Sequence, residues 1–234
     1  NCWQTVDGIS DHMLNFLENH DEQRFASWEY AGNAALVLPS LVVCATINRG
    51  AMMIYAGQEL GERAIDAEGF SGRDGRTSIF DYWSIPTVRR WYNHGKCNEE
   101  HLSQYEIKLR NTYARVLSLC NREKAISEGQ FFDLMYVNYG NLNPHRQYTY
   151  LRTYGDEVLL IAVNFDNAPC NINIDVPPLA FSSLRLRQGE YNGSELLGGR
   201  KRDFRLAIGS PVPVEIPANG AVIWKLLPSS TDEK

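Results

Sequence analysis

The sequence has little cysteine, little excess charge of either sign and no apolar run that could span a membrane. Its five cysteines are scattered and odd in number, without a CxxC spacing, which argues against a zinc site or a dense disulfide scaffold. The net charge of −5 does not indicate nucleic acid or an anionic membrane surface as a partner. The apolar stretch 34–47 is shorter than the about 20 residues that a spanning helix needs. We therefore expect a globular protein with no nucleic-acid partner and no membrane insertion.

A cluster of polar side chains follows directly after a short apolar run near the start of the chain. Residues 13–17 are mostly apolar, and Glu18, Asn19, His20 and Asp21 come next. This order is typical of a strand that leaves a core and presents functional groups at its C-terminal end, where α/β barrels hold their active sites. The alternative is an ordinary loop, because loops are often rich in such residues.

Two motifs carry a resemblance to a known family. Residues 16–21, FLENHD, followed by Arg24, resemble the F-x-E-N-H-D segment that ends the seventh barrel strand in the α-amylase family of retaining glycoside hydrolases. Residues 50–59, GAMMIYAGQE, are similar to that family's eighth-strand segment G-x-P-x-x-Y-x-G-Q-E, with Met52 in place of the proline. The resemblance implies the C-terminal part of a (β/α)8 TIM barrel, followed by an antiparallel β-sandwich domain.

The position of the first motif sets the expected domain organisation. A complete barrel takes roughly 250 residues, but here the seventh-strand motif comes at residue 16 of a chain of 234. We therefore expect the C-terminal part of a larger enzyme, whose missing N-terminal barrel part would be a packing partner. Residues 1–125 are predicted to be the C-terminal portion of the catalytic barrel, and residues 126–234 the β-sandwich domain.

The predicted elements of the first domain alternate between strand and helix, as in a barrel. Proline is tolerated in the first turn of a helix, and glycine commonly follows a helix end. On these signals and on apolar periodicity we predict strands over 13–17 and 51–55, and a helix over 33–47 with Pro39 near its first turns. A short helix starts at 84–86, with Pro86 at its first position, and ends at Gly95. A third helix, capped by Asn98, covers 98–121.

After about residue 125 the pattern changes to short runs of β-forming residues separated by turn signals. Such a pattern is typical of an antiparallel β-sandwich. Turns are predicted at 155–156, 192–193 and 219–220, and strands at 131–136, 148–154, 157–164, 171–176, 212–216 and 221–226.

The resemblance also implies roles for the site residues. Asp21 would be the catalytic transition-state stabiliser, binding the 2- and 3-hydroxyls of the sugar ring that is cleaved, and His20 would donate a hydrogen bond to the same ring. Glu18, Asn19 and Arg24 would support these two side chains. The residues expected to shape the floor of the site are Tyr55, Gly57, Gln58 and Glu59. In the family, the nucleophile Asp and the acid/base Glu lie on the fourth and fifth strands, so this chain alone is predicted to be inactive.

The long segment 62–97 is expected to form a rim of the site. Four of its carboxylates, Asp66, Glu68, Asp74 and Asp81, come after the eighth strand, where the family does not hold its nucleophile, although Gly72-Arg73-Asp74 superficially resembles the nucleophile motif. Its aromatic rings would stack on pyranose rings or, in the simpler interpretation, fix the segment to the barrel. These rings are Phe70, Phe80, Tyr82, Trp83, Trp91 and Tyr92.

The resemblance also implies the substrate of the parent enzyme, an α-linked glucan such as starch or a maltodextrin. We expect no cofactor and no metal ligands in this chain, although the full-length parent could hold a structural calcium ion. The motif is shared within the family, so the sequence leaves open a hydrolase, a transglycosylase or isomerase, and a non-catalytic carbohydrate-binding or accessory protein. Intact Glu18, Asn19, His20 and Asp21 argue against the last, because a dead site is free to lose them.

Overall fold

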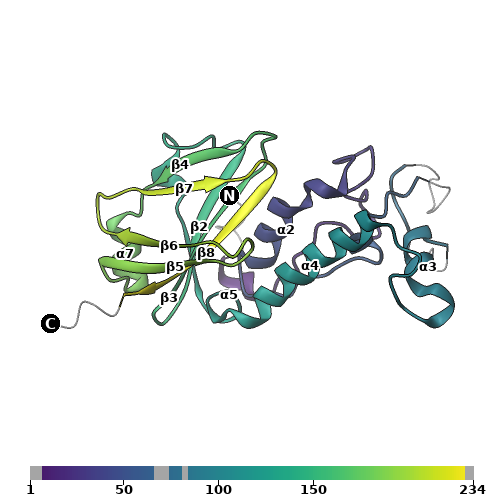
Figure 1. Ribbon diagram of the computed structural model, residues 1–234, viewed down its shortest axis with the longest axis horizontal. Coiled ribbons are helices and arrows are strands. Elements are labelled where there is room, and N and C mark those ends of the chain that lie inside the picture. The colour runs from purple at the N-terminus through teal and green to yellow at the C-terminus, as the bar shows by residue number, and fades with distance from the viewer. Residues whose placement is uncertain (1–6, 66–73, 81–83, 230–234) are drawn as a thin grey trace. The chain divides into compact units, whose positions relative to one another are not determined.

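The computed structural model describes residues 7–65, 74–80 and 84–229, and the chain divides into two compact units (Figure 1). The first unit consists of Asn1–Ala45 and Gly50–Leu117, and the second of Thr46–Arg49 and Ser118–Lys234. The short segment Thr46–Arg49 therefore belongs to the second unit, although it lies between two stretches of the first.

Helices account for most of the regular structure in the first unit. As predicted, Pro39 lies within the first turn of α2, where its missing N–H would have no helical acceptor. Pro86 opens α3, also as predicted. The helical elements are η1 (Asp7–His12), η2 (Ala34–Leu36), α2 (Val37–Thr46), η3 (Gln58–Leu60), α3 (Pro86–Tyr92), η4 (Asn93–Gly95) and the long α4 (Gln104–Arg122), whose last turn belongs to the second unit.

The start of α4 differs from the prediction. Asn98 does not cap it; the helix begins at Gln104, after Ser103. The Ser103 N–H donates to Glu106 Oε2 over 2.7 Å, and the Glu106 N–H donates to Ser103 Oγ over 3.3 Å. This reciprocal pair is a capping box. It supplies acceptors for N–H groups that the first helical turn leaves unpaired, so the helix starts there.

The two predicted barrel strands are reduced to one parallel bridge between Asn15 and Met52. The Asn15 N–H donates to Ala51 O, and the Met53 N–H donates to Asn15 O, each over 2.8 Å. Residues 13–17 and 51–55 are thus neighbours in the predicted orientation. Within the described part of the first unit, no longer strand is present, so a barrel portion is not seen.

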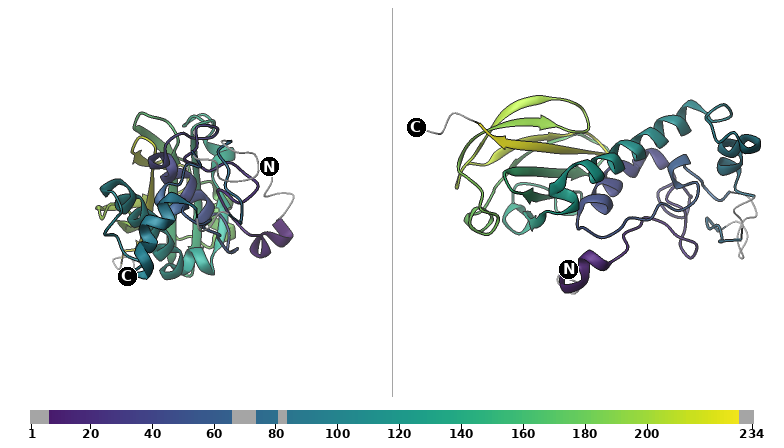
Figure 2. Two further views of the ribbon diagram at one scale, coloured as in Figure 1. Left: turned by 90° about the vertical axis from the view of Figure 1, so that its right-hand side faces the viewer. Right: turned by 90° about the horizontal axis from the view of Figure 1, so that it is seen from below.

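The second unit contains two antiparallel sheets, which confirms the predicted β-sandwich. The larger sheet has the order β1-β2-β3-β8-β5-β6, and β4 pairs with β7 in the smaller one. Figure 2 shows the twist of the strands in its right-hand view. The strands are β1 (Gln130–Asp133), β2 (Gln147–Tyr154), β3 (Glu157–Asn164), β4 (Cys170–Ile174), β5 (Gly189–Glu195), β6 (Lys201–Leu206), β7 (Val212–Ile216) and β8 (Gly220–Pro228), with short helices α5 (Lys124–Ser127), α6 (Met135–Asn138) and α7 (Pro178–Leu184).

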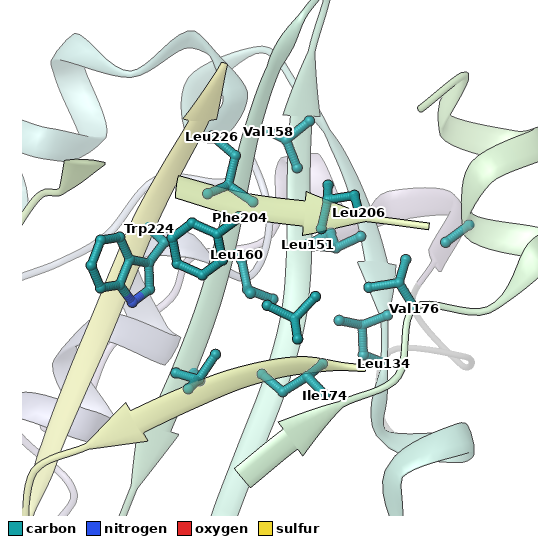
Figure 3. Close-up of a cluster of buried hydrophobic side chains, with 14 of the residues drawn as sticks. Leu134, Leu151, Val158, Leu160, Ile174, Val176, Phe204, Leu206, Trp224 and Leu226 are labelled. Atoms are coloured by element: carbon teal, nitrogen blue, oxygen red, sulfur yellow. The ribbon is translucent and has the colours of Figure 1, made fainter. Parts of the chain in front are cut away.

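The core of the sandwich is built from alternate residues of the strands (Figure 3). Leu160 in β3 lies opposite Leu151 in β2 and Trp224 in β8, and all three side chains are buried. The Trp224 ring meets Phe204 of β6 edge-on, with centroids 4.9 Å apart. Full burial of one such apolar side chain stabilises the fold by roughly 1.5–3 kcal/mol.

Strands β5 and β6 and helix α7 were not predicted, and the predicted turn at Asn192-Gly193 is wrong. Both residues lie inside β5, paired with β6. A Cβ atom at Gly193 would lie 2.4 Å from the Phe204 ring. Glycine is therefore present because an aromatic ring packs directly against the strand, and not because the chain turns. The predicted strand 131–136 also ends early, at Asp133, because α6 begins at Met135.

The opposite face of the larger sheet carries a buried arginine. Arg152 of β2 donates to backbone carbonyls of Ala125, Ile126, Gly129 and Ile47 over 2.6 to 3.3 Å. These carbonyls come from α5, from the turn before β1 and from the segment Thr46–Arg49. One guanidinium thus ties three separate parts of the second unit together.

Candidate functional site

The candidate site lies where the two motif segments run side by side. The parallel bridge between Asn15 and Met52 makes both segments end on the same side. Arg24, which follows the first motif, reaches the end of the second, where its Nη2 donates to Ala56 O over 2.8 Å. The two motifs, more than thirty residues apart in the sequence, are therefore brought together by backbone and side-chain contacts.

A buried ion pair forms the base of the site. Arg24 is 0% exposed and Glu18 is 1% exposed, and Arg24 Nη1 lies 3.1 Å from Glu18 Oε2. Burial raises the pKa of Glu18 to about 7, although Arg24 acts in the opposite direction. The Arg24 guanidinium lies over the Tyr55 ring, 4.3 Å from its centroid. Removing two charged groups from water costs free energy, and contacts of this kind offset part of that cost.

Asn19 turns the chain above this base. Its Oδ1 accepts the N–H groups of Asp21 and Glu22 over 2.8 and 3.0 Å. Side-chain oxygens of Asn commonly hold a turn in this way. The turn directs the next two residues away from the buried pair.

His20 and Asp21 are consequently exposed. Their side chains are 51% and 77% accessible, and His20 Nε2 lies 3.4 Å from Asp21 Oδ2. A carboxylate and an imidazole in contact at the surface can accept and donate hydrogen bonds to the hydroxyl groups of a ligand. Thus the predicted support residues are buried or turn-forming, and the two predicted ligand-binding residues are free to contact a partner. Their functional roles stay predictions.

The predicted floor residues lie beside this base, and the structure adds partners that the sequence did not indicate. The Tyr55 hydroxyl donates to Thr77 O over 3.1 Å. Gln58 is buried and contacts Tyr113 of α4. The buried Glu62 accepts the Thr87 hydroxyl over 2.6 Å. Tyr113 and Thr87 lie on helices distant in sequence from both motifs, so no local signal could have identified them.

One of the predicted rim carboxylates, Asp74, lies among the described residues. Asp74 contacts Arg76, with Oδ2 3.8 Å from Nη1, as expected of a charge on a loop. Asp66, Glu68, Asp81 and the first two residues of Gly72-Arg73-Asp74 lie outside the described residues.

Among the predicted rim aromatics, Trp91 and Tyr92 line an open cavity of about 880 Å³, together with His94 and His101. Neither His20 nor Asp21 lines it. Phe80 is exposed, and the remaining rings, Phe70, Tyr82 and Trp83, lie outside the described residues.

Three other features bear on metals, disulfides and membranes. Within residues 7–65, 74–80 and 84–229, no three His, Cys, Asp or Glu side chains are grouped so as to hold a metal ion. The four described cysteines, Cys44, Cys97, Cys120 and Cys170, form no disulfide. No helix in the described part of the chain has both the length and the apolar character needed to cross a membrane.

No family model and no curated protein matches the sequence, whereas solved structures do. An α-amylase from Anoxybacillus, described as a new glycosyl hydrolase subclass, is 18% identical with a TM-score of 0.62, over 97% of this chain and 41% of that one. The maltogenic α-amylase AmyB from Thermotoga neapolitana is 16% identical with a TM-score of 0.59, over 97% and 46%. The α-amylase from Geobacillus thermoleovorans, complexed with acarbose, is 15% identical with a TM-score of 0.62, over 98% and 42%.

The likeness at this identity shows a shared fold. The chain spans 41 to 46% of the length of these three proteins. Its antiparallel second unit is consistent with the C-terminal β-sandwich of amylases. The resemblance indicated by the two motifs is confirmed in this sense: the structural neighbours of this chain are glycoside hydrolases of the α-amylase family.

Proposed function

We propose that this chain is the C-terminal part of an α-amylase-like glycoside hydrolase that acts on α-linked glucans by a retaining, double-displacement mechanism. The observation that carries the proposal is the geometry around the parallel bridge. The two motif segments end together, Glu18 and Arg24 form a buried base, and His20 and Asp21 stand exposed above it. A neighbour solved with acarbose supports a carbohydrate ligand.

In this mechanism Asp21 binds the sugar ring through hydrogen bonds, and it forms no covalent bond with the substrate. Cleavage of the glycosidic bond passes through an oxocarbenium-like transition state, and hydrogen bonds to the sugar 2-hydroxyl that strengthen there contribute several kcal/mol. Asp21 would accept hydrogen bonds from the 2- and 3-hydroxyls, and His20 would donate one to the same ring. The turn made by Asn19 and the base made by Glu18 and Arg24 would fix both side chains before the substrate binds.

Two further carboxyl groups, about 5 Å apart, are needed as nucleophile and as acid/base. We propose that they are supplied by the N-terminal part of the parent barrel. The 234-residue chain alone should therefore release no reducing sugar from starch. Turnover of starch by the purified chain would contradict this part of the proposal.

Binding can be tested without catalysis. We would titrate the isotope-labelled chain with maltotriose and follow the resonances of His20 and Asp21. Both should shift, and Asp21→Asn should weaken the response several-fold. The matched control is Glu22→Gln, which removes the same charge from an exposed neighbouring side chain. Equal responses of the Asp21 and Glu22 variants would refute the role of Asp21.

His20 and Asp21 would hold the sugar ring in both hydrolysis and glycosyl transfer. Product analysis of the full-length parent, with a sugar acceptor present, distinguishes the two. Transfer products would identify a transglycosylase and free maltodextrins a hydrolase. A parent barrel without the nucleophile and the acid/base would be a non-catalytic binding protein.

A further inference from the structure

A buried chain of contacts leads from helix α4 to the base of the candidate site. It begins at Tyr113 of α4 and continues through the side-chain amide of Gln58, and both residues are almost fully buried. Gln58 Nε2 donates to the Tyr113 hydroxyl over 3.1 Å, and Gln58 Oε1 accepts the Tyr55 N–H over 3.0 Å. The orientation of this amide is thus defined at both ends.

The chain continues from Tyr55 to the ion pair. The Tyr55 ring lies beneath the Arg24 guanidinium, and Arg24 in turn contacts Glu18 and the carbonyl of Ala56. Tyr55 therefore lies between the amide of Gln58 and the guanidinium. A displacement of the Tyr55 backbone would move the surface on which Arg24 rests.

The Tyr113 hydroxyl accepts the Gln58 hydrogen bond in its uncharged form. Burial raises its pKa, and the nearby carboxyl groups of Glu18 and Glu59 act in the same direction. The hydrogen bond from Gln58 lowers the pKa of Tyr113, and burial outweighs it. The hydroxyl is therefore protonated at neutral pH, and the contact with Gln58 does not depend on a change of charge.

We propose that Tyr113 is a positioning residue for the candidate site, acting through Gln58 and Tyr55 on the Arg24–Glu18 pair. Tyr113 is buried and would act only through its neighbours. The proposal depends on the proposed function at one point: the loop above this pair carries His20 and Asp21, the residues proposed to bind the sugar. The coupling itself is measurable in the unliganded chain.

The decisive variant is Tyr113→Phe, which removes one hydroxyl and keeps the ring. The control is Tyr105→Phe on the same helix, whose hydroxyl contacts Asn33 over 3.2 Å. Loss of one hydrogen bond should accelerate hydrogen exchange of the Tyr55 amide by roughly 3- to 10-fold in Tyr113→Phe. The control should leave this rate unchanged.

A second readout separates positioning from general destabilisation. Because Arg24 lowers the pKa of Glu18, a loosened Arg24 should raise that pKa above its value of about 7. Carboxyl NMR of Glu18 should show this rise in Tyr113→Phe and not in Tyr105→Phe. An unchanged Tyr55 exchange rate and an unchanged Glu18 titration in folded Tyr113→Phe would overturn the proposal.

If Tyr113→Phe does not fold, the same comparison is made with Gln58→Met, which removes the amide from the middle of the chain of contacts. Faster Tyr55 exchange and a raised Glu18 pKa would support the coupling, and native values of both would overturn it. Maltotriose titration of the unmodified chain is a separate arm. A lack of binding there would count against the proposed function and leave the coupling result unaffected.

Discussion

Replacement of Glu18 by Gln should remove a pH dependence that the buried site imposes on stability. Glu18 is fully buried beside Arg24, and burial raises its pKa from 4.5 to about 7. In the unfolded chain the same carboxyl group is hydrated and has its ordinary pKa. Between these two values the folded protein holds a proton on Glu18 that the unfolded chain has released.

The sign and the size of the effect follow from this difference. Where the folded state binds more protons than the unfolded state, the free energy of unfolding falls as the pH rises. The contribution of Glu18 is fully present below pH 4.5 and is lost progressively up to about pH 7. Integrated over that window, it amounts to about 3 kcal/mol. Gln is neutral at every pH, so Glu18→Gln should lack this loss.

The assay is urea unfolding at several pH values from 4.5 to 7.5, followed through the methyl resonances of Met52 and Met53, which report on the first unit. The exposed Glu22→Gln variant is the control and should keep the pH dependence of the unmodified chain. The reasoning fails if Glu18→Gln and the unmodified chain lose stability equally between pH 5 and 7. It also fails if the unmodified chain becomes more stable over that interval.

Three further predictions concern stability and are checked by urea unfolding of the chain. Arg152→Met removes the donor of four backbone carbonyls and should destabilise the second unit by about 3–5 kcal/mol. The control is Arg205→Met at an exposed position, which should change the free energy of unfolding by less than about 1 kcal/mol. Gly193→Ala forces the Phe204 ring to move and should destabilise the sandwich by about 1–3 kcal/mol. Ser103→Ala removes the cap of α4 and should lower stability by about 1 kcal/mol. Each argument is contradicted by a variant as stable as the unmodified chain.

The elements that the sequence predicted well are those specified by local patterns. Strands β3 and β7 have the predicted bounds, since β-branched runs between turn residues define them. Helix α3 begins at Pro86 as expected. Within the motif 16–21, Glu18 and Asn19, which were predicted to be supports, have local or nearby partners. Phe16, predicted to lie in a strand that leaves a core, is 42% exposed instead.

The errors arise where a distant contact overrides a local signal. Gly193 resembles a turn residue, but its small size admits Phe204 from the neighbouring strand. The start of α4 is the exception, because the missed signal there is local: Ser103 and Glu106 have the spacing of a capping box, whereas Asn98 contacts Asn93. The partnership of Gln58 with a helix 55 residues further along the chain has no counterpart in the local sequence.

The buried guanidinium of Arg152 has a consequence for the order in which the protein can fold. It binds Ile47, 105 residues earlier, and the neighbouring Tyr150 hydroxyl meets Thr46 at 2.5 Å. During synthesis, the segment that contains these two early residues emerges well before the strand that binds them. Thr46 and Ile47 therefore lack these partners until β2 has been synthesised. Closing so long a loop carries an entropic penalty, so we expect this contact to form late, after the hairpins of the sandwich.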